Sequence, residues 1–254
     1  IRGALFAARD AETPRIYFDD LRVASLSNIE LTYRGQELRQ EDAAVFMQLL
    51  HFAREVPLGI VVEFTGRKML QDLGWSTNSK AYERLRKSID RMTATSIKVK
   101  MTIKSETSGY GGSIIRNFRW KSDAGEPLTK WQVWMDPEII SLFKPDTYSL
   151  LAWEQRKQLD NRSPLTLWLH SFLSSHREPL AISVQKYAEL SNSGIKETKH
   201  FKQALQKALM RLTTAGFLLD WQISEGSDIV RVIRNPDRFP TDESGLGAGQ
   251  RLLT

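Results

Sequence analysis

Two stretches of this 254-residue chain follow the same plan. Residues 85–93 read Leu-Arg-Lys-Ser-Ile-Asp-Arg-Met-Thr, and residues 205–213 read Leu-Gln-Lys-Ala-Leu-Met-Arg-Leu-Thr. Each forms the second half of a predicted basic amphipathic helix, follows a shorter helix after a tight polar turn, and runs into a predicted β-hairpin. A unit of this kind can place its second helix in a DNA major groove with the hairpin beside it as a wing. The duplication therefore predicts a protein with two DNA-binding units in tandem.

Composition agrees with an acidic partner. The net charge is +6, the pI is about 9.5, and 41% of the residues are hydrophobic, enough for one or two domains. The absence of cysteine excludes disulfides and thiolate nucleophiles and is typical of a reducing cytoplasm, where we expect this protein. No apolar run approaches the ~20 residues that cross a bilayer. The start at Ile1 does not resemble a natural initiation site, so we expect residues upstream.

The first predicted unit begins with a helix from Thr65 to Leu73 that ends at Gly74. Capping residues at 76–79 then start a helix that runs to about residue 94. Apolar residues at 81, 82, 85, 89 and 92 form one side of this helix. The opposite side carries a basic stripe of Lys80, Arg84, Lys87 and Arg91.

The wing of this unit is predicted from strict alternation at residues 97–104. A glycine-rich turn at 108–113 is expected to reverse the chain into a second strand at 114–121, whose polar side holds Asn117, Arg119 and Lys121. A further strand around 131–135 and a short helix at 137–143 follow.

The second unit is predicted from residue 163, where a serine cap precedes Pro164 at the first helical position. A strand at 180–184, a short helix at 185–190 and a turn at 191–194 lead into a long helix from about 196 to 215. Strands at 217–223 and 229–233 are expected to pair as the second hairpin.

These patterns predict an α+β chain of two tandem winged-helix domains, each a helix–turn–helix plus a β-hairpin wing. The predicted boundaries are an N-terminal segment at 1–38, the first winged helix at 39–145, a connecting helix or linker at 146–163, the second winged helix at 164–234 and a disordered tail at 235–254.

No catalytic constellation emerges from the residues, and we expect neither enzymatic activity nor a cofactor or metal. The four histidines lack ligand spacing. The glycine-rich segment at 109–113 lacks the Gly-Lys-Ser/Thr ending of a phosphate loop. Gly-x-Ser-x-Gly and His-x-His are both missing. Trp120, flanked by Arg119 and Lys121, is either a core residue or a platform for an unpaired base.

The predicted DNA contacts lie on the two long helices and the two wings. Residues near each helix start are expected to reach base edges: Asn78, Ser79, Lys80, Arg84, Lys196, Lys199, Lys202 and Gln203. Residues further along the helices are expected to touch phosphate or stay solvated: Lys87, Arg91, Gln206, Lys207 and Arg211. Wing candidates for phosphate or the minor groove are Lys98, Lys100, Lys104, Arg231 and Arg234.

Several phrases of the sequence carry a family resemblance. They are Thr-Tyr-Arg-Gly-Gln-Glu-Leu-Arg at 32–39, Gln-Asp-Leu-Gly-Trp-Ser at 71–76, Ala-Thr at 94–95 and Phe-Leu-Ser-Ser-His-Arg-Glu-Pro at 172–179. On these phrases the chain resembles the TrfA family of plasmid replication initiators of broad-host-range plasmids, from residue 4 to about residue 234.

The resemblance implies two winged-helix domains that bind origin iterons, open an adjacent AT-rich region and help load the host replicative helicase without a nucleotide. It also implies monomers that bind iterons, inactive dimers, and contacts with single-stranded origin DNA, the host initiator and the sliding clamp. Residues 139–143 keep the Ser-Leu-Phe end of a clamp-binding peptide but lack its leading glutamine, so core packing is the preferred interpretation.

Three alternatives remain open from sequence. A winged-helix transcriptional repressor of plasmid genes would carry the same basic helices. A protein-interaction module could use the same fold as a scaffold. A nicking enzyme would need a metal site that the sequence does not display.

Overall fold

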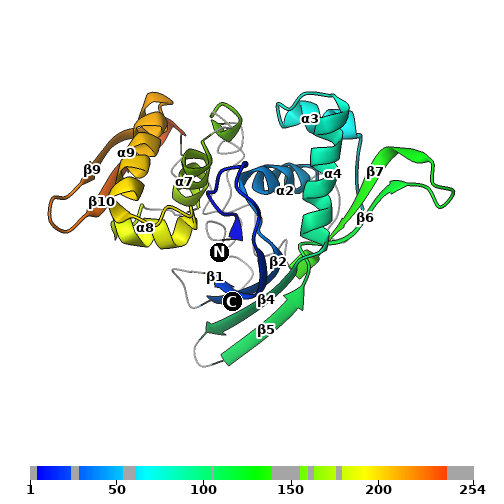
Figure 1. Cartoon of the computed structure of the whole chain (residues 1–254), viewed down its shortest axis with the longest axis horizontal. Helices are drawn as coiled ribbons and strands as arrows, with labels where there is room; N and C mark the ends of the chain where they lie inside the picture. The colour runs from blue at the N-terminus through cyan, green and yellow to red at the C-terminus, as the bar shows by residue number, and fades with distance from the viewer. Residues whose placement is uncertain are drawn as a thin grey trace, which may run out of the picture.

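The computed structural model describes residues 5–23, 29–53, 61–103, 106–138, 155–159, 163–175 and 179–238. Helices and antiparallel sheets build two halves, each around its own hydrophobic core (Figure 1). The first core draws on residues 5–135, and the second on residues 159–230 together with Ala8. The mixture of helices and strands agrees with the fold class predicted from the sequence.

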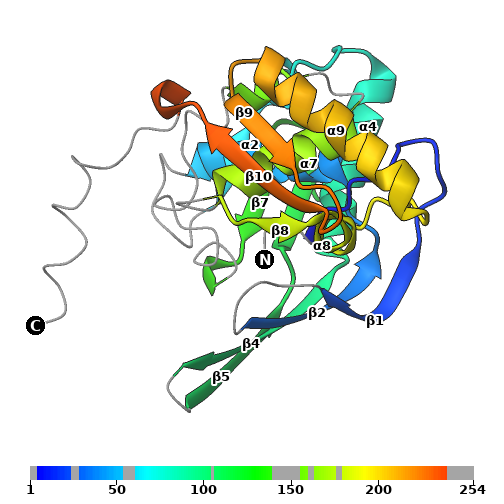
Figure 2. The ribbon, with the colours of Figure 1, turned by 90° about the vertical axis from the view of Figure 1, so that its left-hand side faces the viewer.

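A four-stranded antiparallel sheet lies at the base of the first half (Figures 1 and 2). Leu31 and Val99 pair across it and face the core. Alternate residues face outward, so the strands show the one-sided pattern of a sheet with one solvated face. In sheet order the strands are β1 (Tyr17–Val23), β2 (Ile29–Gln36), β4 (Ser96–Ile103) and β5 (Glu106–Gly112).

The hairpin predicted between residues 97–104 and 114–121 is wrong. Strand β4 pairs with β5, formed by the serine- and glycine-rich segment that the sequence indicated as a turn, and with β2 on its other side. Glycine usually weakens strands, but here Gly109 and Gly111 pair with Lys100 and Lys98 at the sheet edge. An edge position beside long side chains tolerates residues without side chains.

The remaining elements of the first half cover this sheet and form a second one. Helix α2 (Gln40–Ala53) packs against α4 (Ser79–Thr93), which follows the short helix α3 (Gly66–Asp72). A three-stranded antiparallel sheet of order β3–β7–β6 places the β6–β7 hairpin beside α4. Its strands are β3 (Val62–Phe64), β6 (Ile115–Lys121) and β7 (Pro127–Met135).

The second half is smaller. Helix α7 (Pro164–Ser174) begins at Pro164 as predicted, although Ser163 forms no side-chain cap. Helix α9 crosses α7 and α8 and packs on a three-stranded sheet of order β8–β10–β9. Its elements are β8 (Ile182–Ser183), α8 (Val184–Ser191), α9 (Thr198–Thr214), β9 (Leu218–Ile223), β10 (Ile229–Arg234) and the 3-10 turn Pro236–Arg238. The predicted second hairpin, β9–β10, is confirmed.

The N-terminal segment joins the two halves. Phe6 is part of the first core and Ala8 of the second. The amide of Ala7 donates to the carbonyl of Leu38, and the amide of Ala8 donates to the carbonyl of Ser191, each at 2.8 Å. Two consecutive residues therefore hydrogen-bond to opposite halves.

Some predicted features lie outside the described residues: Lys104, most of the helix expected at 137–143, the start of the expected linker helix and the tail from residue 239. Within the described part of the chain, no helix combines the length and apolar character needed to cross a bilayer.

Candidate nucleic-acid interface

Helix α4 is anchored by capping and by its apolar face. The side chain of Asn78 accepts a hydrogen bond from the amide of Ala81 at 2.9 Å, so this residue caps the helix. Leu85, Ile89 and Met92 are completely buried. The capping role and the apolar face agree with the pattern read from the sequence.

The opposite face of α4 does not carry four equivalent cations. Lys80 is exposed, and Lys87 is exposed but pairs with Glu83 at 2.8 Å. Arg84 is half-exposed and donates to Glu41. Arg91 departs from the expectation of a solvated or phosphate-binding residue, because its side chain is only 13% exposed and pairs with acidic residues of α2.

Those acidic residues are Glu41 and Asp42 in the first turn of α2. Asp42 is fully buried and accepts from Ser88 Oγ and from Arg91, each at 2.7 Å. Arg15 of the N-terminal segment pairs with both carboxylates. Burial raises the pKa of Glu41, but the charges of its arginine neighbours outweigh burial and hold that pKa below its usual value. The cluster thereby fixes α4 against α2.

Helix α9 presents its first turns to solvent. Lys196, Lys199 and Gln203 are exposed, and Gln206 is half-buried. Lys202 instead pairs with Asp228 in the loop between β9 and β10, which ties the helix to its own hairpin. Further along, Arg211 donates to the hydroxyl of Ser163.

Helices α4 and α9 lie on the same side of the molecule. Both face the viewer in Figure 1 and both lie toward the right in Figure 2. They run in opposite senses: in Figure 1 α4 descends from α3, whereas α9 rises from α8. The exposed cations Lys80 and Lys199 lie on these two helices, and the exposed Lys196 lies in the turn just before α9.

Each long helix has a hairpin at its outer flank, but the one beside α4 is β6–β7. Its exposed cations include Arg116, which pairs with Asp136 at 2.7 Å, and Arg119, which pairs with Asp123 at 3.2 Å. Lys121 is also exposed, as is Lys130, which lies 3.9 Å from Glu63. Trp120 stacks on Phe118 with ring centroids 4.9 Å apart, so one of its faces is covered.

On the β9–β10 hairpin, Arg231 is exposed and donates to Ser224 Oγ at 3.0 Å. Arg234 is half-buried and donates to the carbonyl of Leu173. Lys98 and Lys100 are on the solvated face of the four-stranded sheet, where Lys100 lies 3.9 Å from Glu30. The structure thus separates the predicted first-wing lysines from the hairpin that flanks α4.

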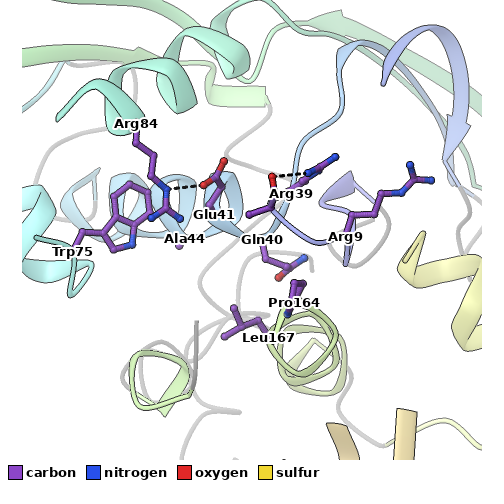
Figure 3. Close-up of a pocket in the computed structure, with 10 residues that line it drawn as sticks. Arg9, Arg39, Gln40, Glu41, Ala44, Trp75, Arg84, Pro164 and Leu167 are labelled. Carbon is purple, nitrogen blue, oxygen red and sulfur yellow. Dashed lines mark hydrogen bonds and ion pairs between the residues drawn. The ribbon is translucent and has the colours of Figure 1, made fainter. Parts of the chain in front are cut away.

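A pocket lies between the halves (Figure 3). Helix α7 forms one wall, and α2 and the start of α4 form the other. Its lining residues are Arg9, Ala11, Arg39, Gln40, Glu41, Ala44, Trp75, Arg84, Pro164 and Leu167.

The sequence did not single out Lys130 or Glu41. It placed Arg119 and Lys121 on the polar side of a wing strand but did not include them among the candidate DNA contacts. The alternation at 115–121 pointed to the latter two, but their strand partner was misassigned. Glu41 gave no signal, because an acidic residue in a first helical turn is ordinarily explained by the helix dipole.

The crystal structure of RctB domains 2–3 superposes with a TM-score of 0.62 at 15% identity, covering 93% of this chain and 97% of that one. A selenomethionine derivative of domains 2 and 3 of RctB gives a TM-score of 0.60 at 13% identity, covering 91% and 96%. At such low identity the likeness concerns the fold alone.

Sequence comparison is more specific. The plasmid replication initiator protein TrfA of Escherichia coli is 30% identical over 220 residues, which cover 85% of this chain and 56% of that protein. The chain thus spans little more than half the length of this relative. The family model described as TrfA protein matches residues 1–232. The match covers nearly the whole chain, and the chain belongs to the TrfA family.

Proposed function

We propose that this chain is the DNA-binding part of a plasmid replication initiator. In this proposal α3–α4 with β6–β7, and α8–α9 with β9–β10, act as two winged helices, and α4 and α9 enter major-groove faces of an origin iteron. The observation that carries the proposal is the exposure of Lys80 and Lys199 on two helices that share one side of the molecule, with Lys196 exposed just before α9. The name of the relative from Escherichia coli supports the assignment to replication initiation.

The contacts divide by position. Side chains at the helix starts, including Ser79, Lys80, Lys199 and Gln203, are assigned to base edges. Exposed cations of the hairpins, including Arg119 and Arg231, are assigned to phosphates, since long flexible cations at a wing follow the backbone without reading sequence. Lys98 and Lys100 would reach the duplex only if the four-stranded sheet also lies along it.

The wider roles are part of the same proposal: opening of the AT-rich region, help in loading the host helicase, contact with the host initiator and the clamp, binding of single-stranded origin DNA, and a monomer–dimer equilibrium. They require no nucleotide or metal from this chain. Because the chain spans about half of its relative, segments outside it can contribute to each of them.

Binding is tested by fluorescence anisotropy with an iteron duplex and a scrambled duplex of equal length. If about six phosphates are neutralised, log affinity falls with log salt at a slope of about −5. Lys199→Ala and Gln203→Ala should reduce the preference for the iteron, whereas Arg119→Ala should weaken both duplexes equally. Lys98→Ala should do the same if the four-stranded sheet also lies along the duplex. Equal, sequence-blind losses from all four variants would remove base reading from α9.

A second assay with the same protein distinguishes a replication initiator from a transcriptional repressor. With the host initiator present, permanganate footprinting of a supercoiled origin should reveal unpaired thymines in the AT-rich region. A transcriptional repressor would bind the iterons and leave the strands paired. A protein-interaction module would give no salt-dependent anisotropy change with either duplex.

A further inference from the structure

Arg84 is held by a residue of another helix, as Arg91 is, but unlike Arg91 it stays largely exposed. Its Nε donates to Glu41 Oε2 at 2.7 Å, and its guanidinium lies 3.9 Å from the ring centroid of Trp75 (Figure 3). Its side chain is nevertheless 48% exposed. Among the described residues its two Nη groups donate to no acceptor, so they remain available to a ligand.

Glu41 is also held by two further arginines through its other carboxylate oxygen. Arg15 and Arg91 bind its other oxygen, Oε1, and their side chains are each only 13% exposed. Arg91 and Arg15 also bind the buried carboxylate of Asp42. Two carboxylates thus face three arginines, and Arg84 is the most exposed of the three. Its release disrupts the cluster least, because each carboxylate keeps two buried partners.

A DNA phosphate is the natural competitor for this arginine. Arg84 lies one helical turn after Lys80 and about one before Lys87, on the exposed side of α4. A phosphate oxygen accepts from a guanidinium in the same forked geometry as a carboxylate. Any phosphate that reaches Arg84 must either displace it from Glu41 or bind its Nη groups beside that negative charge.

We propose that Glu41 is a specificity-determining residue that holds Arg84 back from the phosphates of DNA lacking the recognition sequence. Correct base contacts bring the backbone close enough to α4 to overcome the ion pair, whereas a loosely held duplex does not. Glu41 thereby lowers binding to non-iteron DNA more than binding to the iteron. The inference rests on the proposed reading role of α4 and names the regulator of one contact within it.

The test is a double-mutant cycle measured by anisotropy with iteron and scrambled duplexes. Glu41→Gln should raise affinity for the scrambled duplex about five-fold and for the iteron about two-fold, and steepen the salt slope by about 1. Arg84→Gln combined with Glu41→Gln should abolish the difference between the two gains, because Glu41 acts only through Arg84.

Glu83→Gln is the matched control. Glu83 precedes Arg84 directly, and its removal changes the charge of the protein equally, but its carboxylate pairs with Lys87. Its effect should be similar for both duplexes and should add to that of Arg84→Gln. An equal gain from Glu41→Gln on both duplexes, or an unchanged gain in the Arg84→Gln background, would overturn the inference while leaving the proposed function intact. Absence of binding by the parent protein would instead overturn the proposed function.

A second measurement requires no change at Glu41. The Nε–H resonance of Arg84, assigned through Arg84→Lys, should shift when the iteron duplex is added and stay near its free position with equimolar scrambled duplex. A resonance that moves equally with both duplexes means that Arg84 is not held back, and one that moves with neither means that it does not take part.

Discussion

The buried guanidinium of Arg156 donates to the side-chain carbonyl of Gln40 at 2.9 Å and so crosses from the second half of the molecule to the first residue of α2. Arg156 also donates to the carbonyl of Leu167 and to Ser171 Oγ in α7. The side-chain Nε2 of Gln40 in turn donates to the carbonyl of Phe6 at 2.7 Å. One arginine therefore connects α7, α2 and the N-terminal segment.

Arg156→Met should lower the free energy of unfolding by about 3 kcal/mol, because buried acceptors in both halves lose their donor. Urea unfolding monitored by tryptophan fluorescence measures the change. Lys157→Met, at the exposed neighbour, should stay within about 0.5 kcal/mol of the parent. A loss below 1 kcal/mol for Arg156→Met would mean that the two halves do not depend on this contact.

Asp42→Asn should destabilise the first half and weaken DNA binding together. The fully buried carboxylate accepts from the amide of Arg39 at 2.9 Å as well as from Ser88 and Arg91, so neutralising it leaves buried arginines undercompensated, at a cost of about 3 kcal/mol. Chemical denaturation and anisotropy check the two effects. Burial raises the pKa of Asp90 on α4, so its charge is not stabilising and Asp90→Asn should leave unfolding nearly unchanged.

Acid should destabilise the protein through His170. Burial, assisted by the charge of Arg156, lowers the pKa of this histidine from 6.5 to about 3. Between these values the unfolded chain binds a proton that the folded chain does not, so the free energy of unfolding falls as pH drops below 6.5, by up to about 1.4 kcal/mol per pH unit.

In His170→Leu, the free energy of unfolding should therefore depend less on pH between pH 5 and 7, with a slope smaller by about that amount. The exposed His200 provides the control, since His200→Gln should keep the steep dependence of the parent. Identical slopes for the parent and His170→Leu would show that His170 has the same protonation in the folded and unfolded chains over this range.

Gly194→Ala should disturb the turn between α8 and α9 more than its backbone angle alone explains. Gly194 and Gly226 share a φ of +78°, but an added Cβ at Gly194 lies 2.9 Å from Arg9 Nε, whereas nothing lies within 4 Å at Gly226. Gly226→Ala should cost about 1 kcal/mol for the left-handed backbone. The excess cost of Gly194→Ala, together with any loss of iteron affinity, measures the Arg9 contact, and equal costs at both positions would exclude it.

Local patterns predicted the elements well. The Asn78 cap, the buried Leu85 and Ile89 and the strand alternation around Val99 follow from spacing alone, because each reflects contacts with the nearest core. Residue spacing did not predict which strands pair with each other. A regular strand such as β4 accepts neighbours on both sides, and only the packed sheet decides that Gly111 lies opposite Lys98.

The candidate interface was predictable only in outline. The exposed positions of Lys80 and Lys199 follow from the helical period. The withdrawal of Arg91 into a cluster with Asp42 does not, since it depends on how α2 crosses α4. Charge on a helix face indicates which side is polar, but the availability of each cation is set by acidic residues far away in sequence.

The opposing senses of α4 and α9 have a consequence for the DNA itself. A duplex bound by both helices at once would contact the N-terminal turns of α4 and α9 in opposite orientations along its axis. The two half-sites of a single iteron should then be oriented oppositely to each other, and inverting one of them while keeping its base composition would abolish simultaneous docking.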